Sequence, residues 1–156
     1  YFYFGHFDSD TLQLSTAVKN MYRHLMNMAG ITADTRVLNV GWGIGELELY
    51  LHENYGCDIW RVYHDPLRIE TAQRRCREKG YEQNIHFQTA DSLIGHFPDN
   101  HFDVVLAFES SVFFNDKSSF MKDCWRILSN SGRMVFADTM LMKELSLADI
   151  FYSYQK

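Results

Sequence analysis

Three closely spaced glycines are typical of a turn that holds an adenosine-containing cofactor. The turn reads Gly41-Trp42-Gly43-Ile44-Gly45 and lies between a short apolar β run and a helical segment. Glycine lets the backbone approach a ligand closely, and N–H groups at the start of a helix face that ligand. The alternative is a turn with a purely structural role. The position of the glycines between a strand and a helix favours a ligand-binding turn.

The spacing of these glycines also bears on the kind of cofactor. In the dinucleotide fingerprint Gly-x-Gly-x-x-Gly, counting from Gly41 puts Glu46 at the third glycine, where a carboxylate would repel a pyrophosphate. The third glycine is instead Gly45. A P-loop is excluded because no Gly-Lys-Ser/Thr follows. The spacing therefore disfavours a nicotinamide-dependent oxidoreductase.

Strands and helices alternate around this turn, which predicts a doubly wound α/β domain with a mainly parallel sheet and helices on both faces. We expect strands at residues 36–40, 59–63, 85–89, 104–108 and 134–137. Helices are expected from Ser15 to Gly30, over 46–55, from Pro66 to Gly80 and over 120–128, with a turn at 129–132. Leu14 and Met28 belong to the expected apolar stripe of the first helix. The chain contains no linker or repeat, so we expect one domain.

The overall charge argues against a nucleic-acid partner. Net charge is −5, whereas non-specific binding to nucleic acid requires a surplus of lysine and arginine. One segment is rich in basic residues: Arg68, Arg74, Arg75, Arg77 and Lys79. We interpret it as the solvated side of a helix whose buried stripe is Ile69, Ala72 and Cys76, rather than as a phosphate-binding face. No apolar run is long enough to cross a bilayer.

The three cysteines point to the compartment. Cys57, Cys76 and Cys124 are odd in number, form no Cys-x-x-Cys motif and lie in apolar or helical contexts. We expect buried thiols in a reducing cytoplasm, and hence a cytoplasmic protein.

Several segments, in order, resemble the class I S-adenosylmethionine-dependent methyltransferases of the small-molecule type. Residues 37–45 match the family's Val-Leu-Asp-x-Gly-x-Gly-x-Gly pattern. Segments that resemble the family's later strand junctions are Asp65-Pro66 with Ile69 and Ala72, Gln88-Thr89-Ala90-Asp91, residues 97–103, Phe108-Glu109-Ser110 and residues 128–138. The resemblance implies a Rossmann-like fold and S-adenosylmethionine as cofactor. It covers almost the whole chain, with a lid and helix at 1–30, the core sheet at 36–138 and the start of a substrate-covering region at 139–156.

The resemblance also implies which residues contact the cofactor. Gly41, Trp42 and Gly43 would line its methionine part, and Gly45 completes the turn. Asp91 would accept a hydrogen bond from the adenine amino group, with Ser92 beside it, and Phe108 and Glu109 would face the sulfonium region. The aromatic segment Tyr3-Phe4-Gly5-His6-Phe7 resembles a lid over the cofactor, and the alternative is a hydrophobic staple onto the first helix.

The sequence departs from the family pattern in three places. Asn39 stands where the family has the acid that anchors the cofactor's ammonium, and its amide offers an oxygen without a charge. Tyr63 stands where the family has the acid that binds the ribose hydroxyls, and His64 follows it. Some fatty-acyl-modifying relatives lack that acid and use a polar side chain one turn later, where this chain has Arg68. The family's last two strands are absent before the end at Lys156, so we expect either a missing C-terminal part or a truncated relative.

We therefore expect methyl transfer to a small acceptor. Glu109 is the first candidate general base, because ligands bind at the carboxyl ends of central strands, and a carboxylate that only orients the cofactor is the alternative. His6 is the second candidate, and we expect no metal site because the histidines lack metal-ligand spacing. Phe108, Phe113 and Phe114 favour an apolar or aromatic acceptor unless they belong to the core. A catalytically silent binding or assembly module is the rival function, and a homo-oligomer is possible.

Overall fold

The computed structural model describes residues 5–89, 97–110 and 114–138. Helices and strands follow one another in the order that the sequence predicts, with β3 and β4 as successive strands among the described elements. They are α1 (Leu14–Ala29), β1 (Arg36–Val40), α2 (Glu46–Tyr55), β2 (Asp58–Tyr63), α3 (Pro66–Glu78), β3 (Ile85–Thr89), β4 (Phe102–Phe108), α4 (Lys117–Ile127) and β5 (Leu128–Ala137).

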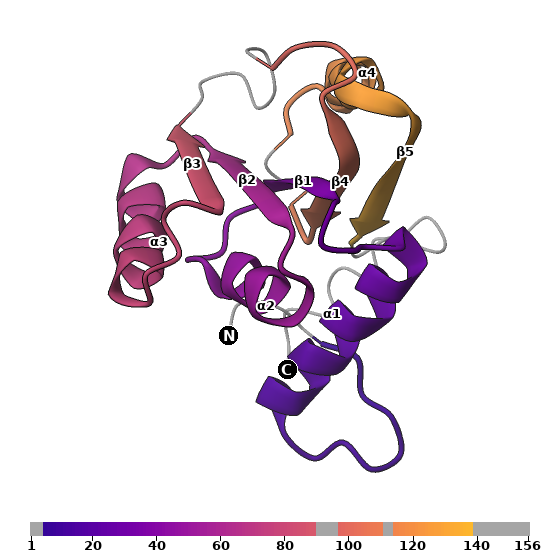
Figure 1. The fold of residues 1–156 in the computed structure, drawn as a ribbon. Coiled ribbons are helices and arrows are strands. Elements are labelled where there is room, and N and C mark those ends of the chain that lie inside the picture. The colour runs from indigo at the N-terminus through magenta and orange to yellow at the C-terminus, as the bar shows by residue number, and fades with distance from the viewer. Residues whose placement is uncertain (1–4, 90–96, 111–113, 139–156) are drawn as a thin grey trace, which may run out of the picture.

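The five strands form one parallel sheet in the order β3-β2-β1-β4-β5 (Figure 1). The first strand, β1, is therefore central. Because all five strands run the same way, their carboxyl ends lie at one edge of the sheet. That edge brings together the turns that follow β1, β2 and β4, although they are far apart in the sequence.

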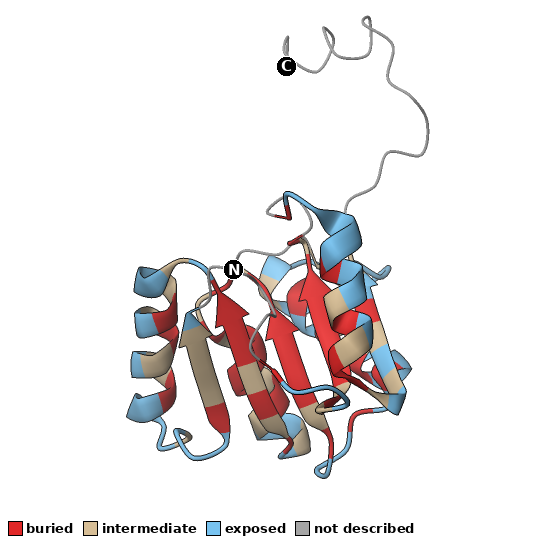
Figure 2. Cartoon of the chain, turned by 90° about the horizontal axis from the view of Figure 1, so that it is seen from above, coloured by how far each residue is buried: buried red, intermediate tan, exposed pale blue. Residues whose placement is uncertain are grey.

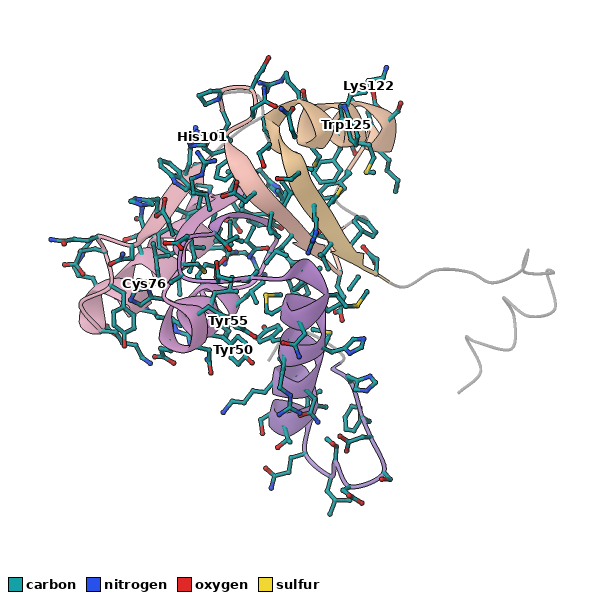
Figure 3. The ribbon with its side chains drawn as sticks, turned by 45° about the vertical axis from the view of Figure 1, so that its right-hand side comes forward. Tyr50, Tyr55, Cys76, His101, Lys122 and Trp125 are labelled. Carbon is teal, nitrogen blue, oxygen red and sulfur yellow. The ribbon has the colours of Figure 1, made fainter. Side chains whose placement is uncertain are left out.

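Helices cover both faces of the sheet, which confirms the doubly wound fold. One core cluster joins side chains of α1, α2 and α3 to one face, and a second cluster joins α4 to the other. The central strands are almost wholly buried between these layers (Figure 2). Between α1 and α2, the rings of Tyr22 and Tyr50 lie 5.2 Å apart, and Tyr55 lies beside Tyr50 on α2 (Figure 3).

Local signals explain most of the helix boundaries. Asp65 caps α3 by accepting a hydrogen bond from the Leu67 N–H at 2.9 Å, and Pro66 occupies the first helical position. Gly30 ends α1 in the left-handed conformation, as predicted. The start of α1 was predicted wrongly, because Gln13 rather than Ser15 is the N-cap residue.

The buried face of α1 also differs from the predicted stripe. Leu14 and Met28 are exposed, and the buried positions are Ala17, Val18, Tyr22, Met26 and Ala29. The two exposed residues lie at the ends of the helix. The apolar spacing therefore continues to both ends of the helix, but the side chains at these ends are not buried.

The predicted turn at residues 129–132 is part of β5. The strand runs unbroken from Leu128 to Ala137, but its register against β4 shifts, so that Phe102 faces Leu128 while Val104 faces Arg133. Polar residues with turn propensity therefore occupy an irregularity within a strand. Among the described helices, none is long and apolar enough to cross a membrane.

Candidate functional site

The glycine turn lies at the carboxyl edge of the sheet, between β1 and α2. Gly45 is the N-cap of α2 and has a φ of 97°, which favours glycine over residues with a side chain. A Cβ added there would also lie 3.2 Å from the Cβ of Ala72 on α3. This glycine is therefore required both by backbone conformation and by the close packing of α3.

Four consecutive carbonyl oxygens of the turn accept hydrogen bonds from three arginine side chains. Arg61 of β2 donates to the carbonyl oxygen of Gly41 at 3.0 Å and also to that of Gly43. Arg68 and Arg75 of α3 donate to the carbonyl oxygens of Trp42, at 3.0 Å, and Ile44, at 2.9 Å. These arginines hold the backbone of the turn in one orientation.

This arrangement corrects the interpretation of the basic segment in part. Arg68 and Arg75 are half-buried and face the turn, so they do not belong to a solvated face. Arg74 and Arg77 are exposed, as predicted. The buried stripe of Ile69, Ala72 and Cys76 is confirmed.

Glu46 occupies the start of α2 and closes the turn. Its Oε2 accepts a hydrogen bond from the Ile44 N–H at 3.2 Å, and its Oε1 accepts one from Arg75 at 2.9 Å. Burial acts to raise the pKa of the Glu46 carboxyl, but Arg75 and the neighbouring backbone N–H groups outweigh it and hold that pKa below its usual range. A carboxylate therefore stands where a dinucleotide's pyrophosphate would need a neutral N–H surface.

Asn39 lies buried beneath the turn, on β1. Its Nδ2 donates to Oε1 of Glu48 at 2.6 Å. Its Oδ1 is buried without a hydrogen-bond partner among the described residues, and it lies 3.4 Å from where a Cβ on Gly41 would be. A buried acceptor beside a residue without a side chain suits a ligand's ammonium group, so Asn39 fits the role that the resemblance implies.

The end of β2 carries no carboxylate at the position of the family's ribose acid. Tyr63 is only 5% exposed, and burial raises the pKa of its phenol. His64 is exposed, and its ring lies 4.3 Å from that of Tyr63. Asp65 is occupied by capping α3 and by an ion pair with Arg68 at 3.5 Å. Arg68 also lies over the Trp42 ring, 5.5 Å from its centre.

The end of β4 is joined to the turn through backbone contacts of Glu109. Its carbonyl oxygen accepts from Nε1 of Trp42 at 3.0 Å, and its N–H donates to the Ala137 oxygen of β5 at 2.6 Å. Glu109 has a φ of 47°, a left-handed conformation that is uncommon for glutamate and is often found at functional sites. The candidate base is therefore held at the same edge as the glycine turn.

The phenylalanines near β4 do not all line an open site. Phe108 is buried in the core cluster under α1 and α2, and Phe114 stacks on Phe120 of α4 at 4.0 Å. Both therefore belong to the core, and Phe113 lies outside the described residues. The aromatic side chains give little support to an aromatic acceptor.

Other candidate residues lie elsewhere or outside the described part. His6 is exposed. Its backbone N–H donates to the Ala17 oxygen at 2.8 Å and its ring stacks on that of His24 with the ring centres 5.8 Å apart, so its described contacts are with α1. Asp91 and Ser92 lie outside the described residues, as do residues 1–4 of the aromatic segment. Within the described ranges, no group of His, Cys, Asp or Glu side chains could hold a metal ion.

Sequence reasoning missed the buried charges beneath the turn. Arg61 and Glu48 form an ion pair at 3.3 Å, with side chains 1% and 0% exposed. The available signals were a charged residue inside the apolar run of β2 and a glutamate on the inner face of α2. Neither signal names the partner, which only the packing of α2 onto the sheet supplies.

Comparisons with known proteins agree with this geometry. Residues 38–136, more than half of the chain, match the family model described as a methyltransferase domain. A methyltransferase of Streptomyces halstedii is 28% identical over 128 residues, covering 82% of this chain and 46% of that protein. A tocopherol O-methyltransferase of Arabidopsis thaliana is 29% identical over 143 residues, covering 84% of this chain and 41% of that protein.

A solved structure extends the likeness of fold. The cyclase SpnF superposes with a TM-score of 0.80 at 20% identity, over 86% of this chain and 50% of that one. The chain spans half or less of the length of these three proteins. The family match and the glycine turn together show that the chain belongs to the class I S-adenosylmethionine-dependent methyltransferases, a family with small-molecule substrates and S-adenosylmethionine as its cofactor.

Proposed function

We propose that this chain binds S-adenosylmethionine over the glycine turn and takes part in methyl transfer to a small, apolar or aromatic acceptor. The observation that carries the proposal is the buried Oδ1 of Asn39, which has no partner among the described residues and lies beside Gly41. Burying an unsatisfied acceptor costs about 1–3 kcal/mol, so such an oxygen is best explained by a ligand donor.

The residues of the turn would hold the amino-acid part of the cofactor. Asn39 would accept from its ammonium, and Gly41, Trp42 and Gly43 would approach it through their backbone. Asp91 and Ser92 would hold the adenine. The ribose would be held near Tyr63 and His64, with Arg68 as the polar side chain one turn later.

The bound cofactor would supply an activated methyl group on a positively charged sulfur. The protein's own work would be to align an acceptor and to exclude water. Glu109 would orient the acceptor or take its proton, since Trp42 and β5 hold its backbone at the carboxyl edge. His6 stays a second candidate, and its packing on α1 makes it the weaker one.

The acceptor class rests on similarity more than on the site. The relative from Arabidopsis thaliana is named for tocopherol, which is an apolar, aromatic molecule. The aromatic side chains next to β4 that we expected to favour such an acceptor are largely core, as described above.

Calorimetric titration with S-adenosylhomocysteine, with NAD as the comparison ligand, tests the cofactor site. We expect saturable binding of S-adenosylhomocysteine and a higher melting temperature in its presence, because a ligand of the folded state stabilises it by mass action. NAD at equal concentration should leave the melting temperature unchanged. Stronger stabilisation by NAD would overturn the proposal.

A catalytically silent module is the rival function, and one observation favours it. Asn39 and Tyr63 replace acids that hold the cofactor in the family. Incubation with methyl-labelled S-adenosylmethionine and a panel of phenols, amines and carboxylic acids separates the two. Cofactor binding without label transfer to any acceptor would favour the silent module.

A further inference from the structure

A buried ion pair connects β2 to α2 directly beneath the glycine turn. Nη1 of Arg61 lies 3.3 Å from Oε2 of Glu48, and both side chains are essentially inaccessible to solvent. Burying two charges costs desolvation energy that their attraction does not reliably recover, so a pair of this kind is weak evidence for stability. Its contacts with the turn point to another role.

Arg61 holds two alternate peptides of the turn. Its Nη2 donates to the carbonyl oxygen of Gly41 at 3.0 Å and also to that of Gly43. In a planar trans peptide the N–H points opposite to the C=O. Drawing these two oxygens toward Arg61 therefore turns the N–H groups of Trp42 and Ile44 away from the interior. The Ile44 N–H meets Glu46 on that side.

Glu48 determines the orientation of the Asn39 amide. An ionised carboxylate only accepts hydrogen bonds, so Asn39 must turn its Nδ2 toward Glu48, at 2.6 Å. Its Oδ1 then faces the side of Gly41, 3.4 Å from that residue's absent Cβ. The amide group therefore presents an acceptor, and not a donor, to the turn.

The pair also keeps the site electrically balanced. A lone guanidinium beneath the turn would repel a ligand that carries a sulfonium and an ammonium. Glu48 neutralises Arg61 within the same buried layer. The Arg61 guanidinium therefore supplies rigidly placed hydrogen-bond donors, while the ion pair as a whole adds no net charge.

We propose that Arg61 and Glu48 are positioning residues of the cofactor site: Arg61 orients the turn peptides, and Glu48 orients Asn39 and neutralises Arg61. The expected effect of the ion pair on cofactor binding rests on the proposed function. The expected effect of the pair on the backbone of the turn can be measured without any ligand.

The test uses the double variant Arg61→Met/Glu48→Leu, which replaces the ion pair with apolar side chains of similar size. Such replacement often keeps or restores stability, whereas removal of one partner leaves a buried charge unpaired. We expect the single variants Arg61→Met and Glu48→Leu to melt at clearly lower temperature, and the double variant to recover most of that loss. Arg74→Met/Glu78→Leu removes an exposed ion pair of α3 and is the matched control.

Two readouts distinguish positioning from support of the fold. In the double variant we expect the affinity for S-adenosylhomocysteine to fall about tenfold or more. A tenfold loss corresponds to the loss of about one good hydrogen bond. Without ligand, we expect faster hydrogen exchange in the peptide that contains residues 41–45, with unchanged exchange in β4. The control should match the wild type in both measurements.

A double variant with wild-type affinity and wild-type exchange in the turn would overturn the inference. If the wild type binds no S-adenosylhomocysteine, the proposed function fails, and exchange alone then decides on the positioning role. If the double variant does not fold, Arg61→Lys takes its place, because lysine keeps the charge but has one nitrogen where Arg61 uses Nη1 for Glu48 and Nη2 for the two carbonyl oxygens. Unchanged exchange in a folded Arg61→Lys variant would equally refute the inference.

Discussion

The indole N–H of Trp42 donates to the carbonyl oxygen of Glu109 at 3.0 Å, joining the turn after β1 to the end of β4. The two strands are neighbours in the sheet, but the residues are 67 positions apart in the chain. This contact fixes the backbone of the candidate base relative to the candidate cofactor turn. It gives the tryptophan a second function beside its place in the glycine motif.

Removing only the indole donor tests that contact. Trp42→Phe keeps an aromatic ring under the Arg68 guanidinium but loses the hydrogen bond to Glu109. We expect affinity for S-adenosylhomocysteine, measured by calorimetry, to fall about fivefold, the equivalent of about 1 kcal/mol for one hydrogen bond. Trp125→Phe is the control, because Trp125 is 84% exposed on α4 (Figure 3). Equal affinities of Trp42→Phe and wild type would show that the contact does not shape the site.

Gly45→Ala tests the close packing of the turn against α3. The substitution adds left-handed strain at a φ of 97° and a contact of 3.2 Å with Ala72. We expect a loss of about 2–4 kcal/mol in unfolding free energy, measured with urea. Gly56→Ala, at the other end of α2, has a φ of 68° and nothing within 4 Å, so it should lose only about 1–2 kcal/mol. Equal losses for both variants would contradict the packing argument.

Tyr63→Asp tests the position of the missing ribose acid. The new carboxylate would lie near the charges of Arg68, Asp65 and Arg61, which already act on the Tyr63 phenol, and the two arginines would favour its ionised form. We expect S-adenosylhomocysteine to bind about tenfold more tightly, while loss of the buried ring costs about 2–4 kcal/mol of stability. Tyr63→Ala, the control, should lose the stability without the gain in affinity. A folded Tyr63→Asp protein with unchanged affinity would mean that the ribose is held elsewhere.

The cysteines make stability depend on alkaline pH. Burial raises the pKa of the Cys57 thiol to about 11 and those of Cys76 and Cys124 to about 12. Between the ordinary thiol pKa, about 9, and these values, the unfolded chain releases protons that the folded chain keeps. The free energy of unfolding should therefore fall as pH rises through this window, by about 1.4 kcal/mol per thiol and pH unit.

Urea denaturation at several pH values between 9 and about 10.5 measures this slope. Cys124→Ala should remove about one third of the part that the thiols contribute, because one of the three titrating thiols is gone. The buried thiols should also resist thiol reagents until the protein unfolds. A wild-type slope in Cys124→Ala would rule out this explanation of the pH dependence.

Local patterns in the sequence determined the order of the elements, the parallel sheet and the glycine turn. Apolar periodicity and turn residues act over a few positions, so the residues in 36–63 alone indicate a strand, a tight turn, a helix and a second strand. The same locality explains the errors. The polar residues 129–132 have turn propensity, but the residues on both sides of them pair with β4, so the register shift absorbs them as an irregularity of β5.

Only the tertiary structure decided which charges hold the turn. Arg61 and Glu48 are 13 positions apart and lie on different elements, and Arg75 reaches the Ile44 oxygen across 31 positions. A charged residue in a helix or strand is usually solvated, and for Arg75 the sequence favoured that interpretation. The packing of α2 and α3 onto the sheet removes water from these side chains. Once buried, they must find partners: the arginines donate to the carbonyl oxygens of the glycine turn, and Glu48 accepts from Arg61 and Asn39.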